Sequence, residues 1–332
     1  MKRRDEALLA LLCDGALHSG ADLATRLGVS RAAVWKLVGE LRERGVAVQS
    51  LPRSGYRLPQ PVELLDAQRI AAGLAGRGWS LGERLEVLFE IDSTNTYLYT
   101  GAVPAPAQPR VTFAELQQAG RGRRGRSWLA PFGSGLTFSV AWTFADAPAG
   151  LPALGLAIGA GVAQALRDLG LADAGVKWPN DLVWQRRKLG GLLLQLRSEA
   201  GGPASVVAGL GLNIALPPEA RAGIDGPDAQ PVADLREALG PRVPARNALA
   251  VALAAAMLDT LDVFSREGYA AFAGNWAELD ALAGARVRVA HTDGSVEGEA
   301  CGADADGALL VRVDGRVQRF YSGDVSVRPA AP

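Results

Sequence analysis

The sequence predicts a multidomain α+β protein: a winged helix-turn-helix unit, a larger α+β unit with a mixed or antiparallel sheet, and a small C-terminal β-barrel. Three observations predict this fold. Three short helical segments separated by glycines open the chain, apolar strand-like runs fill its middle, and Asp-Gly turns recur near its end. With 332 residues, the chain is also long enough for two or three domains of about 150 residues each.

The composition excludes several classes of protein. The 35 Lys and Arg balance the 35 Asp and Glu, and 48% of the residues are apolar, as in globular proteins. No apolar run reaches the roughly 18 residues of a membrane span, and Asp14 interrupts the first apolar stretch before it is long enough for export. We therefore expect a cytoplasmic protein that does not contact a membrane. Cys13 and Cys301 lie far apart and there are only two histidines, so we expect neither a disulfide nor a metal site made of side chains.

The first unit, residues 1–60, contains three short predicted helices and a β-hairpin. The helices cover residues 5–12, 21–27 and 31–44, and a glycine ends each of them. Ser30 is an N-cap candidate for the third helix. Residues 46–58 alternate apolar and polar side chains around a Pro-Arg-Ser-Gly turn, which predicts a hairpin, or wing.

This first unit is basic, whereas the rest of the chain is acidic. Its first 58 residues hold ten Lys and Arg against six Asp and Glu, so a net charge of +4 is balanced by −4 elsewhere. In a helix-turn-helix, the N-terminal end of the last helix reaches base edges in the major groove of DNA. The predicted DNA-contacting residues are Ser30, Arg31, Trp35 and Lys36 on that helix and Arg53 at the tip of the wing. The alternative is that the three helices only cover the next domain with a solvated basic face.

The second unit spans residues 64–280 and follows a linker that Pro59 and Pro61 indicate. Strands are predicted at 85–92, 111–118, 135–144, 188–198 and 205–216, with a shorter pair within 176–184. Residues 151–169 and 245–264 have apolar faces at helical period. Strands separated by hairpins, with a few helices on one side, favour an α+β sheet over a doubly wound one.

The third unit, residues 284–329, has short strands at regular spacing. Asp-Gly pairs at 293–294, 306–307 and 314–315 indicate tight turns between these strands. Three such turns in about 45 residues predict a small β-barrel.

Residues that can carry chemistry are densest in the stretch QQAGRGRRGRSW, residues 117–128. Its four arginines are Arg121, Arg123, Arg124 and Arg126. They alternate with glycines, so the backbone can approach a polyphosphate or carboxylate that guanidinium groups surround. The glycines also satisfy Gly-x-Gly-x-x-Gly, but a dinucleotide site requires a helix next, and a strand preceded by proline and glycine follows instead. A solvated basic loop remains the alternative.

Three further clusters place polar groups beside predicted strands. Asn180 and Asp181 follow Pro179 in a turn, and Lys188 follows in Lys-Leu-Gly-Gly, where its ammonium can neutralise a carboxylate or phosphate oxygen. The other two clusters are Ser93, Thr94 and Asn95 after one strand, and Asn213 at the end of a glycine-rich strand. The alternatives are a plain hairpin corner for the first cluster and a helix cap for the second. The sequence has no P-loop motif, so ATP needs a site of another kind.

Taken together, the motifs DSTN, QQAGRGRRGRSW, KWPNDL and RKLGG resemble the catalytic motifs of biotin protein ligases, in the same order and spacing. With a helix-turn-helix in front, the whole chain resembles the bifunctional biotin ligases that also repress the biotin operon. The resemblance implies a class II synthetase-like catalytic domain with a mixed sheet and a C-terminal Src-homology-3-like β-barrel.

The resemblance also implies an activity and its partners. ATP and biotin give biotinyl-5′-AMP, and biotin then passes to one lysine of the biotin carboxyl carrier protein of acetyl-CoA carboxylase. Mg²⁺ accompanies ATP and is bound mainly through the phosphates. Biotinyl-AMP is expected to favour a homodimer that binds operator DNA of the biotin synthesis genes.

The site residues follow from the same resemblance. Lys188 and Arg123 are the expected catalytic residues. The expected biotin-binding residues are Ser93, Thr94, Asn95, Gln117, Arg121, Gly122, Arg123 and Lys188. The expected nucleotide-binding residues are Arg124, Arg126, Trp128, Asn180, Asp181 and Asn213.

Two features differ from better-known members of the family. Residues 216–240 lack the tryptophan that helps the corresponding loop order over the adenylate, and KLGG stands where KLAG is common. A ligase with a vestigial DNA-binding domain is therefore the alternative function. A ligand-sensing repressor without catalysis is disfavoured because Arg123 and Lys188 are both present, and a lipoate ligase because its basic loop differs.

Overall fold

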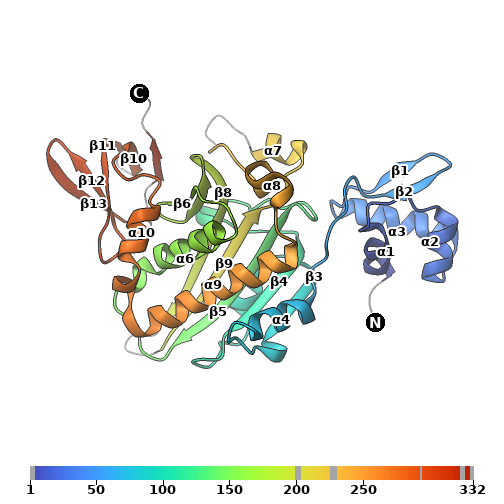
Figure 1. Ribbon diagram of the computed structural model, residues 1–332, viewed down its shortest axis with the longest axis horizontal. Helices are drawn as coiled ribbons and strands as arrows, with labels where there is room; N and C mark the ends of the chain where they lie inside the picture. The colour runs from blue at the N-terminus through green and yellow to red at the C-terminus, as the bar shows by residue number, and fades with distance from the viewer. Residues whose placement is uncertain (1–3, 199–202, 225–229, 292–293, 322–325, 330–332) are drawn as a thin grey trace.

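In the part of the chain that it describes, the computed structural model has three β-sheets, each in a different region of the sequence (Figure 1). The structure describes residues 4–198, 203–224, 230–291, 294–321 and 326–329. A two-stranded sheet belongs to the N-terminal unit, a seven-stranded sheet to the central unit and a five-stranded sheet to the C-terminal unit.

The N-terminal unit is a helix-turn-helix followed by a hairpin, as predicted. Its elements are α1 (Arg4–Leu12), α2 (Gly20–Leu27), α3 (Arg31–Glu43), β1 (Gln49–Leu51) and β2 (Gly55–Arg57). Ser30 caps α3, because its Oγ accepts a hydrogen bond from the Ala33 amide at 3.1 Å. The hairpin is fastened to the helices where His18 and Tyr56 exchange two backbone hydrogen bonds. At this contact a Cβ on Gly55 would lie 1.9 Å from the His18 carbonyl oxygen, so only glycine fits.

The central sheet is mixed, as the sequence predicts. Its strands are β3 (Leu85–Ile91), β4 (Arg110–Gln117), β5 (Gly135–Phe144), β6 (Ala174–Lys177), β7 (Asp181–Trp184), β8 (Arg187–Ser198) and β9 (Ala204–Asn213). Their order is β3-β4-β5-β9-β8-β7-β6. Strands β3 and β4 are parallel, and all other neighbours are antiparallel.

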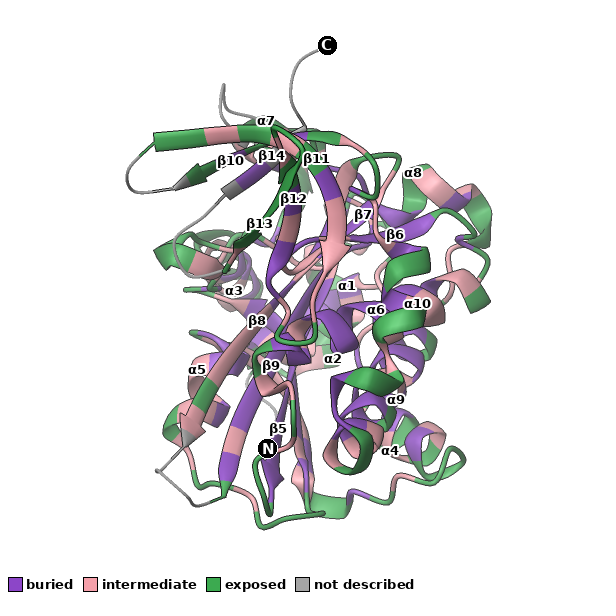
Figure 2. Cartoon of the chain, turned by 90° about the vertical axis from the view of Figure 1, so that its left-hand side faces the viewer, coloured by how far each residue is buried: buried purple, intermediate pink, exposed green. Residues whose placement is uncertain are grey.

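Helices cover both faces of this sheet (Figure 2). The larger layer contains α4 (Ala67–Ala75), α6 (Leu154–Asp168), α9 (Arg246–Glu267) and α10 (Ala273–Leu279), and α5 (Thr94–Thr100) lies on the opposite face. Two short helices, α7 (Pro218–Ile224) and α8 (Leu235–Leu239), follow β9. Short 3₁₀ turns occupy Gly82–Arg84, Arg123–Gly125, Leu151–Ala153, Gly240–Arg242 and Tyr269–Ala271. Within the described ranges, α9 alone is long and apolar enough to cross a membrane, but most of it is buried, as in the core helix of a folded domain.

The C-terminal unit is an antiparallel sheet with the order β13-β12-β11-β10-β14. Its strands are β10 (Arg286–His291), β11 (Gly294–Ala303), β12 (Leu309–Val313), β13 (Arg316–Phe320) and β14 (Ser326–Pro329). Asp314 and Gly315 both have positive φ, 48° and 77°, in the predicted tight turn. Asp306 and Gly307 also lie in a loop between strands, whereas Asp293 of the remaining predicted turn lies outside the described residues.

A buried ion pair holds the linker between the first two units. Arg246 at the start of α9 and Glu115 on β4 are 2.8 Å apart and only 6% and 7% exposed. Glu115 also accepts a hydrogen bond from the Leu65 amide at 2.5 Å, and Arg246 donates to the Glu63 carbonyl at 2.7 Å. Buried charges are tolerated when they are paired and hydrogen-bonded in this way, so the linker path is well defined.

The N-terminal unit shares its apolar core with the central sheet. Leu116 of β4 packs in the same cluster as the buried leucines and valines of α1 and α3, together with Phe89 and Phe132. Arg44, which follows α3, pairs with Asp5 of α1 and also lies 3.5 Å from Glu90 of β3. The end of α3 is therefore tied to β3 at the edge of the central sheet.

Candidate active site

A cavity of about 780 Å³ opens above the central sheet. All fourteen residues expected at the biotin and nucleotide sites line it, namely Ser93, Thr94, Asn95, Gln117, Arg121, Gly122, Arg123, Arg124, Arg126, Trp128, Asn180, Asp181, Lys188 and Asn213. They come from the ends of β3, β4, β7, β8 and β9 and from the loops after them. Sequence segments more than 100 residues apart thus meet at one place.

One end of the cavity is a hydrogen-bonded group around the start of α5. Ser93 caps this helix, so the cap alternative for this cluster also holds. Gln117 Oε1 accepts hydrogen bonds from the Thr94 amide at 2.8 Å and from Thr94 Oγ1 at 3.2 Å. Thr94 Oγ1 also shares a 2.9 Å hydrogen bond with Ser139 Oγ of β5. Because the Gln117 oxygen is occupied, its Nε2 donors are the part of the amide left for a ligand.

Asn95 presents a buried acceptor to the same end. Its Nδ2 donates to the Leu193 carbonyl at 3.0 Å, and the side chain is 4% exposed. Its Oδ1 is buried, and no hydrogen-bond partner for it is found in the described part of the chain. An unsatisfied buried oxygen is costly, so this geometry favours a ligand that brings an N–H donor.

The arginine-rich loop forms a tight turn over the cavity. The Gly122 amide donates to the Arg126 carbonyl at 2.7 Å, and the Trp128 amide donates to the Gly120 carbonyl at 2.8 Å. Arg124 has φ 58°, which is uncommon for a residue with a side chain. The turn directs Arg123 inward, where its Nη1 donates to Asn180 Oδ1 at 3.0 Å.

Electrostatics around Arg123 suit an anionic ligand. Burial lowers the pKa of Arg123 from its ordinary value, and the neighbouring charges of Arg124 and Arg126 lower it further, while Asp181 opposes them. Arginine nevertheless stays protonated in proteins. A guanidinium that is partly desolvated beside two like charges gains much from a bound carboxylate or phosphate.

Lys188 lies across the cavity from this loop. Its Nζ is 2.6 Å from Asp181 Oδ1 and 5.9 Å from the centre of the Trp128 ring. Asp181 begins β7 and Lys188 lies on β8, so the hairpin between these strands makes the pair. Asn180, in the turn before β7, donates through Nδ2 to the Leu192 carbonyl at 2.7 Å and thereby fixes the same corner.

Two glycines make room for this arrangement. A Cβ on Gly211 would lie 2.4 Å from the Trp128 indole, so glycine lets the ring pack flat on β9. A Cβ on Gly190 would lie 2.6 Å from the Gly211 carbonyl oxygen. The glycine of KLGG therefore lets β8 and β9 approach more closely than an alanine would without a backbone shift.

The second end of the cavity contains residues that the sequence motifs did not single out. Lys177 Nζ donates to Gln230 Oε1 at 2.8 Å, and both side chains line the cavity. Ile224 of α7, Val232 and Val327 of β14 also line it. Lys177 is the lysine of KWPN, so this motif carried a signal; the other residues come from segments without a recognisable pattern.

Asn213 lies at this end with its amide already engaged. Its Nδ2 donates to the Ala233 carbonyl at 3.0 Å and lies 3.5 Å from the Lys188 carbonyl. The side chain thus holds the segment after α7 against β8. Nowhere in the described ranges do three or more His, Cys, Asp or Glu side chains gather as metal ligands.

The residues expected to contact DNA lie elsewhere, on α3 and the wing. The side chain of Trp35 is 71% exposed and that of Lys36 is 77% exposed, and Arg31 is exposed too. Arg53 is exposed in the hairpin turn with φ 61°. An exposed tryptophan beside two cations on one helix is typical of a binding surface.

The cavity combines a polar pocket with converging cations, and a winged helix-turn-helix precedes it in the chain. Together these features define a class of protein: a ligase that activates a carboxylate with a nucleotide and carries a DNA-binding unit. Three family models match the chain, an HTH domain over residues 3–57, the Biotin/lipoate A/B protein ligase family over 88–213 and the Biotin protein ligase C terminal domain over 283–328. The chain belongs to the biotin protein ligase family, in its bifunctional ligase/repressor group.

Individual relatives support this membership. The bifunctional ligase/repressor BirA of Escherichia coli is 39% identical over 97% of each chain. The biotin–[acetyl-CoA-carboxylase] ligase of Mycobacterium tuberculosis is 35% identical over 76% of this chain and 90% of that relative. The structure of the Aquifex aeolicus biotin protein ligase in complex with biotin and ATP matches with a TM-score of 0.62 and 25% identity, over 74% of this chain and 99% of that chain. The family, fold class and type of enzyme predicted from the motifs are thereby confirmed.

Proposed function

We propose that this chain joins biotin to a lysine of a biotin carboxyl carrier protein through biotinyl-5′-AMP, and that the same intermediate makes it a repressor of biotin synthesis genes. The grouping of all fourteen expected residues around one cavity carries this proposal. Both the carrier protein and the operator DNA lie in the cytoplasm, and we propose that the chain works there without a membrane.

The end around Asn95 fits the ureido ring of biotin. This ring has two N–H donors and one carbonyl acceptor. Asn95 Oδ1 is a buried acceptor that needs a donor, and Gln117, whose Oε1 is already occupied, offers Nε2 as a donor in the wall of the same cavity. Complementary donors and acceptors of this kind select a ligand because the wrong ligand leaves buried groups unpaired.

The opposite end fits the reacting carboxylate and ATP. The carboxylate oxygen attacks the α-phosphorus, the bond to the bridging oxygen breaks, and pyrophosphate leaves. Arg123 and Lys188 converge on this region from the loop and from β8, so they can neutralise the two anions and the charge that develops between them. In the second step the lysine nitrogen of the carrier protein attacks the acyl carbon, and AMP leaves with the electron pair of the broken bond.

Mg²⁺ is proposed to reach this site with ATP. The described side chains form no cage of carboxylates, and Asp181 already pairs with Lys188. This donor set fits a Mg²⁺ ion that the phosphates hold rather than the protein. There the ion would neutralise phosphate charge as pyrophosphate leaves.

Dimerisation is proposed to use the edge of β8. Among the described residues, β8 pairs with β7 only over Arg187–Gly191, whereas it pairs with β9 as far as Ser198. The Leu192 backbone is still engaged by Asn180, so the outer edge beyond Leu192 leaves backbone groups for another strand, and Leu196 on it is 43% exposed. Two chains paired there would present two α3 helices to a palindromic operator.

A transfer assay tests the proposed enzyme activity. The protein is incubated with biotin, Mg·ATP and a carrier-domain fragment, and the fragment is weighed by mass spectrometry. We expect one biotin-sized mass increase, no increase without ATP, and none when the acceptor lysine of the fragment is replaced by arginine. An unmodified fragment in the complete reaction contradicts the proposed function.

A further inference from the structure

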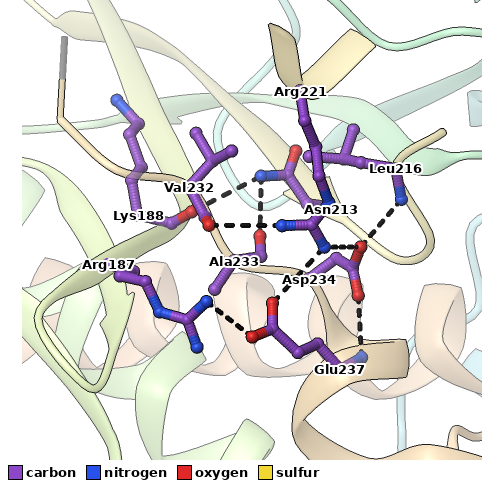
Figure 3. A network of polar contacts seen from close by, with 9 residues as sticks. All are labelled: Arg187, Lys188, Asn213, Leu216, Arg221, Val232, Ala233, Asp234 and Glu237. Atoms are coloured by element: carbon purple, nitrogen blue, oxygen red, sulfur yellow. Dashed lines mark hydrogen bonds and ion pairs between the residues drawn. The ribbon is translucent and has the colours of Figure 1, made fainter. Parts of the chain in front are cut away.

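The segment after α7 runs alongside Lys188 and fixes its backbone (Figure 3). The Lys188 amide donates to the Pro231 carbonyl at 2.7 Å, and the Ala233 amide donates to the Lys188 carbonyl at 2.8 Å. Val232 thereby pairs with Lys188 as a parallel bridge. Because Val232 also lines the cavity, this segment forms part of the cavity wall beside Lys188.

A buried carboxylate follows directly in this segment. Asp234 is 3% exposed, and its Oδ1 accepts a hydrogen bond from the Glu237 amide at 2.8 Å, which caps α8. Its Oδ2 accepts from the Leu216 amide at 2.9 Å and from Arg221. A carboxylate this buried costs stability unless its oxygens are satisfied, and Arg221 supplies the balancing charge.

Arg221 connects α7 to this carboxylate, to Glu237 and to the backbone of Val232 (Figure 3). Its Nη2 also lies 3.4 Å from Glu237 Oε2, and its Nη1 donates to the Val232 carbonyl at 3.4 Å. Glu237 Oε1 in turn pairs with Arg187 at 2.5 Å. Positive and negative side chains therefore alternate from α7 to the residue immediately before Lys188.

Helix α7 depends on such contacts because it is short. Seven residues are too few for a helix to be stable in water by itself. In the described part of α7, Arg221 is the residue whose side chain hydrogen-bonds outside the helix. The last residue of α7, Ile224, lines the cavity, as do Lys188 and Asn213.

We propose that Arg221 is a positioning residue for the nucleotide. Its ionic cluster with Asp234, Glu237 and Arg187 holds α7 against the cavity. In this position, Ile224 and Val232 form part of the cavity wall. Arg221 itself does not contact the reacting atoms. The inference rests on the proposed ligase function. It deepens that function by assigning to an ionic cluster the task of holding the cavity wall beside the nucleotide.

Substitution of Arg221 tests this role. Arg221→Met keeps most of the side-chain length and removes the charge. Arg221→Lys keeps the charge but lacks the planar guanidinium group. Arg236→Met is the matched control, because Arg236 is an exposed arginine of α8. In biotin-dependent pyrophosphate exchange, we expect Arg221→Met to raise KM for ATP about tenfold, because a charged, partly buried hydrogen-bond donor is lost. Its kcat and its Kd for biotin alone should stay within about twofold of the parent. Arg221→Lys should recover part of the loss, and Arg236→Met should match the parent.

Hydrogen exchange of the ligand-free protein supplies a readout that does not depend on activity. Amides 219–224 should exchange faster in Arg221→Met than in the parent or in Arg236→Met. Unchanged exchange of these amides overturns the proposal. So does a loss of biotin binding as large as the rise in KM for ATP, or a fall in kcat with an unchanged KM for ATP. A parent protein that catalyses no pyrophosphate exchange refutes the proposed function instead, while the exchange of amides 219–224 still decides whether Arg221 holds α7.

Discussion

Asn180 connects the arginine-rich loop to strand β8 at the cavity. Its amide donates to the Leu192 carbonyl and accepts from Arg123, so it is fixed on both sides. The next residue, Asp181, pairs with Lys188. A single turn therefore orients both cations that the proposed chemistry needs, although they lie 65 positions apart in the chain.

Removing either cation should disable the first half-reaction. We expect Lys188→Ala and Arg123→Ala each to slow biotinyl-adenylate formation more than about a hundredfold, because a preorganised charge at a developing anion contributes several kcal/mol. Biotin binding alone should fall less in the Lys188 variant. Pyrophosphate exchange measures the rate, with Arg236→Met as a control outside the cavity. Rates within about tenfold of the parent for either variant contradict the assignment.

Asp280 predicts a pH effect on stability. Its Oδ1 accepts from the Leu282 amide at 2.9 Å, whereas its Oδ2 is buried and has no hydrogen-bond partner among the described residues. Burial raises the pKa of Asp280 from 3.8 to about 6. The folded state therefore binds this proton more tightly than the unfolded state does, so its contribution to stability is present below pH 3.8 and is lost as the pH rises to about 6.

Asp280→Asn should reveal this loss. The variant minus parent difference in unfolding free energy should grow by about 2 kcal/mol between pH 4 and pH 6 and level off above about pH 7. Thermal or urea unfolding at each pH measures it. Asp173→Asn, on an exposed carboxylate, should show no such pH-dependent difference. A difference that does not depend on pH rules out the titration of Asp280 as the cause.

The sequence could predict which residues meet in the cavity but not how they bond. The resemblance of the motifs to those of biotin protein ligases identified Thr94, Gln117, Asn180 and Lys188 as members of one site. The buried pair of Glu115 and Arg246 had no such signal, since its members lie 131 positions apart. Only the three-dimensional path of the linker brings them together.

At the scale of single elements, β9 is the strand against which the Trp128 indole packs. Gly211 gives the Trp128 ring its space, and β9 pairs with β5 on one side and β8 on the other. Any side chain at this position has to push the ring toward Lys188, which lies 5.9 Å from the ring centre.

Gly211→Ala tests that packing. The added Cβ would lie 2.4 Å from the indole, so we expect the ring to shift, stability to fall by about 1–3 kcal/mol and KM for ATP to rise more than biotin Kd. Unfolding curves and pyrophosphate exchange measure the two effects. Gly274→Ala on α10, where the added carbon meets no atom from elsewhere in the fold within 4 Å, should not lower stability and should leave KM for ATP unchanged. Equal effects from both substitutions would show that Trp128 has no special role.

The long elements of the central unit were predictable, whereas its shortest helices were not. The largely apolar stretch of β5 predicted its bounds, Gly135–Phe144, and the apolar periodicity of α6 and α9 predicted both helices. Helices α7 and α8 have seven and five residues, too few for a periodic signal. Their positions depend on Asp234 and Arg221, which bond across the segment, so tertiary contacts decide what local sequence leaves open.

On the scale of the whole molecule, the proposed DNA-binding surface and the cavity are separate. Arg31, Trp35 and Lys36 are exposed on α3, and none of them lines the cavity. Substitutions on that helix should therefore affect repression alone.

We expect Arg31→Ala with Lys36→Ala to abolish operator binding and to leave ligation intact, because phosphate and base contacts are lost far from the cavity. In the parent, biotin with Mg·ATP should tighten binding to a palindromic operator, since the adenylate favours the dimer. Footprint titrations at fixed salt measure both effects, because such affinities depend strongly on salt. Normal ligation with no ligand-dependent shift in the parent contradicts the proposed repressor function.

The core that the N-terminal unit shares with β4 also limits how a gene of this kind can shorten during evolution. Leu116, which packs on that unit with Phe89 and Phe132, lies between Glu115, which holds the linker, and Gln117, which lines the cavity. Deleting the first unit leaves these apolar side chains facing water beside intact catalytic residues, and such patches cause aggregation. A single-function ligase can therefore descend from a two-function ancestor of this type only when the deletion is accompanied by polar substitutions at the end of β4.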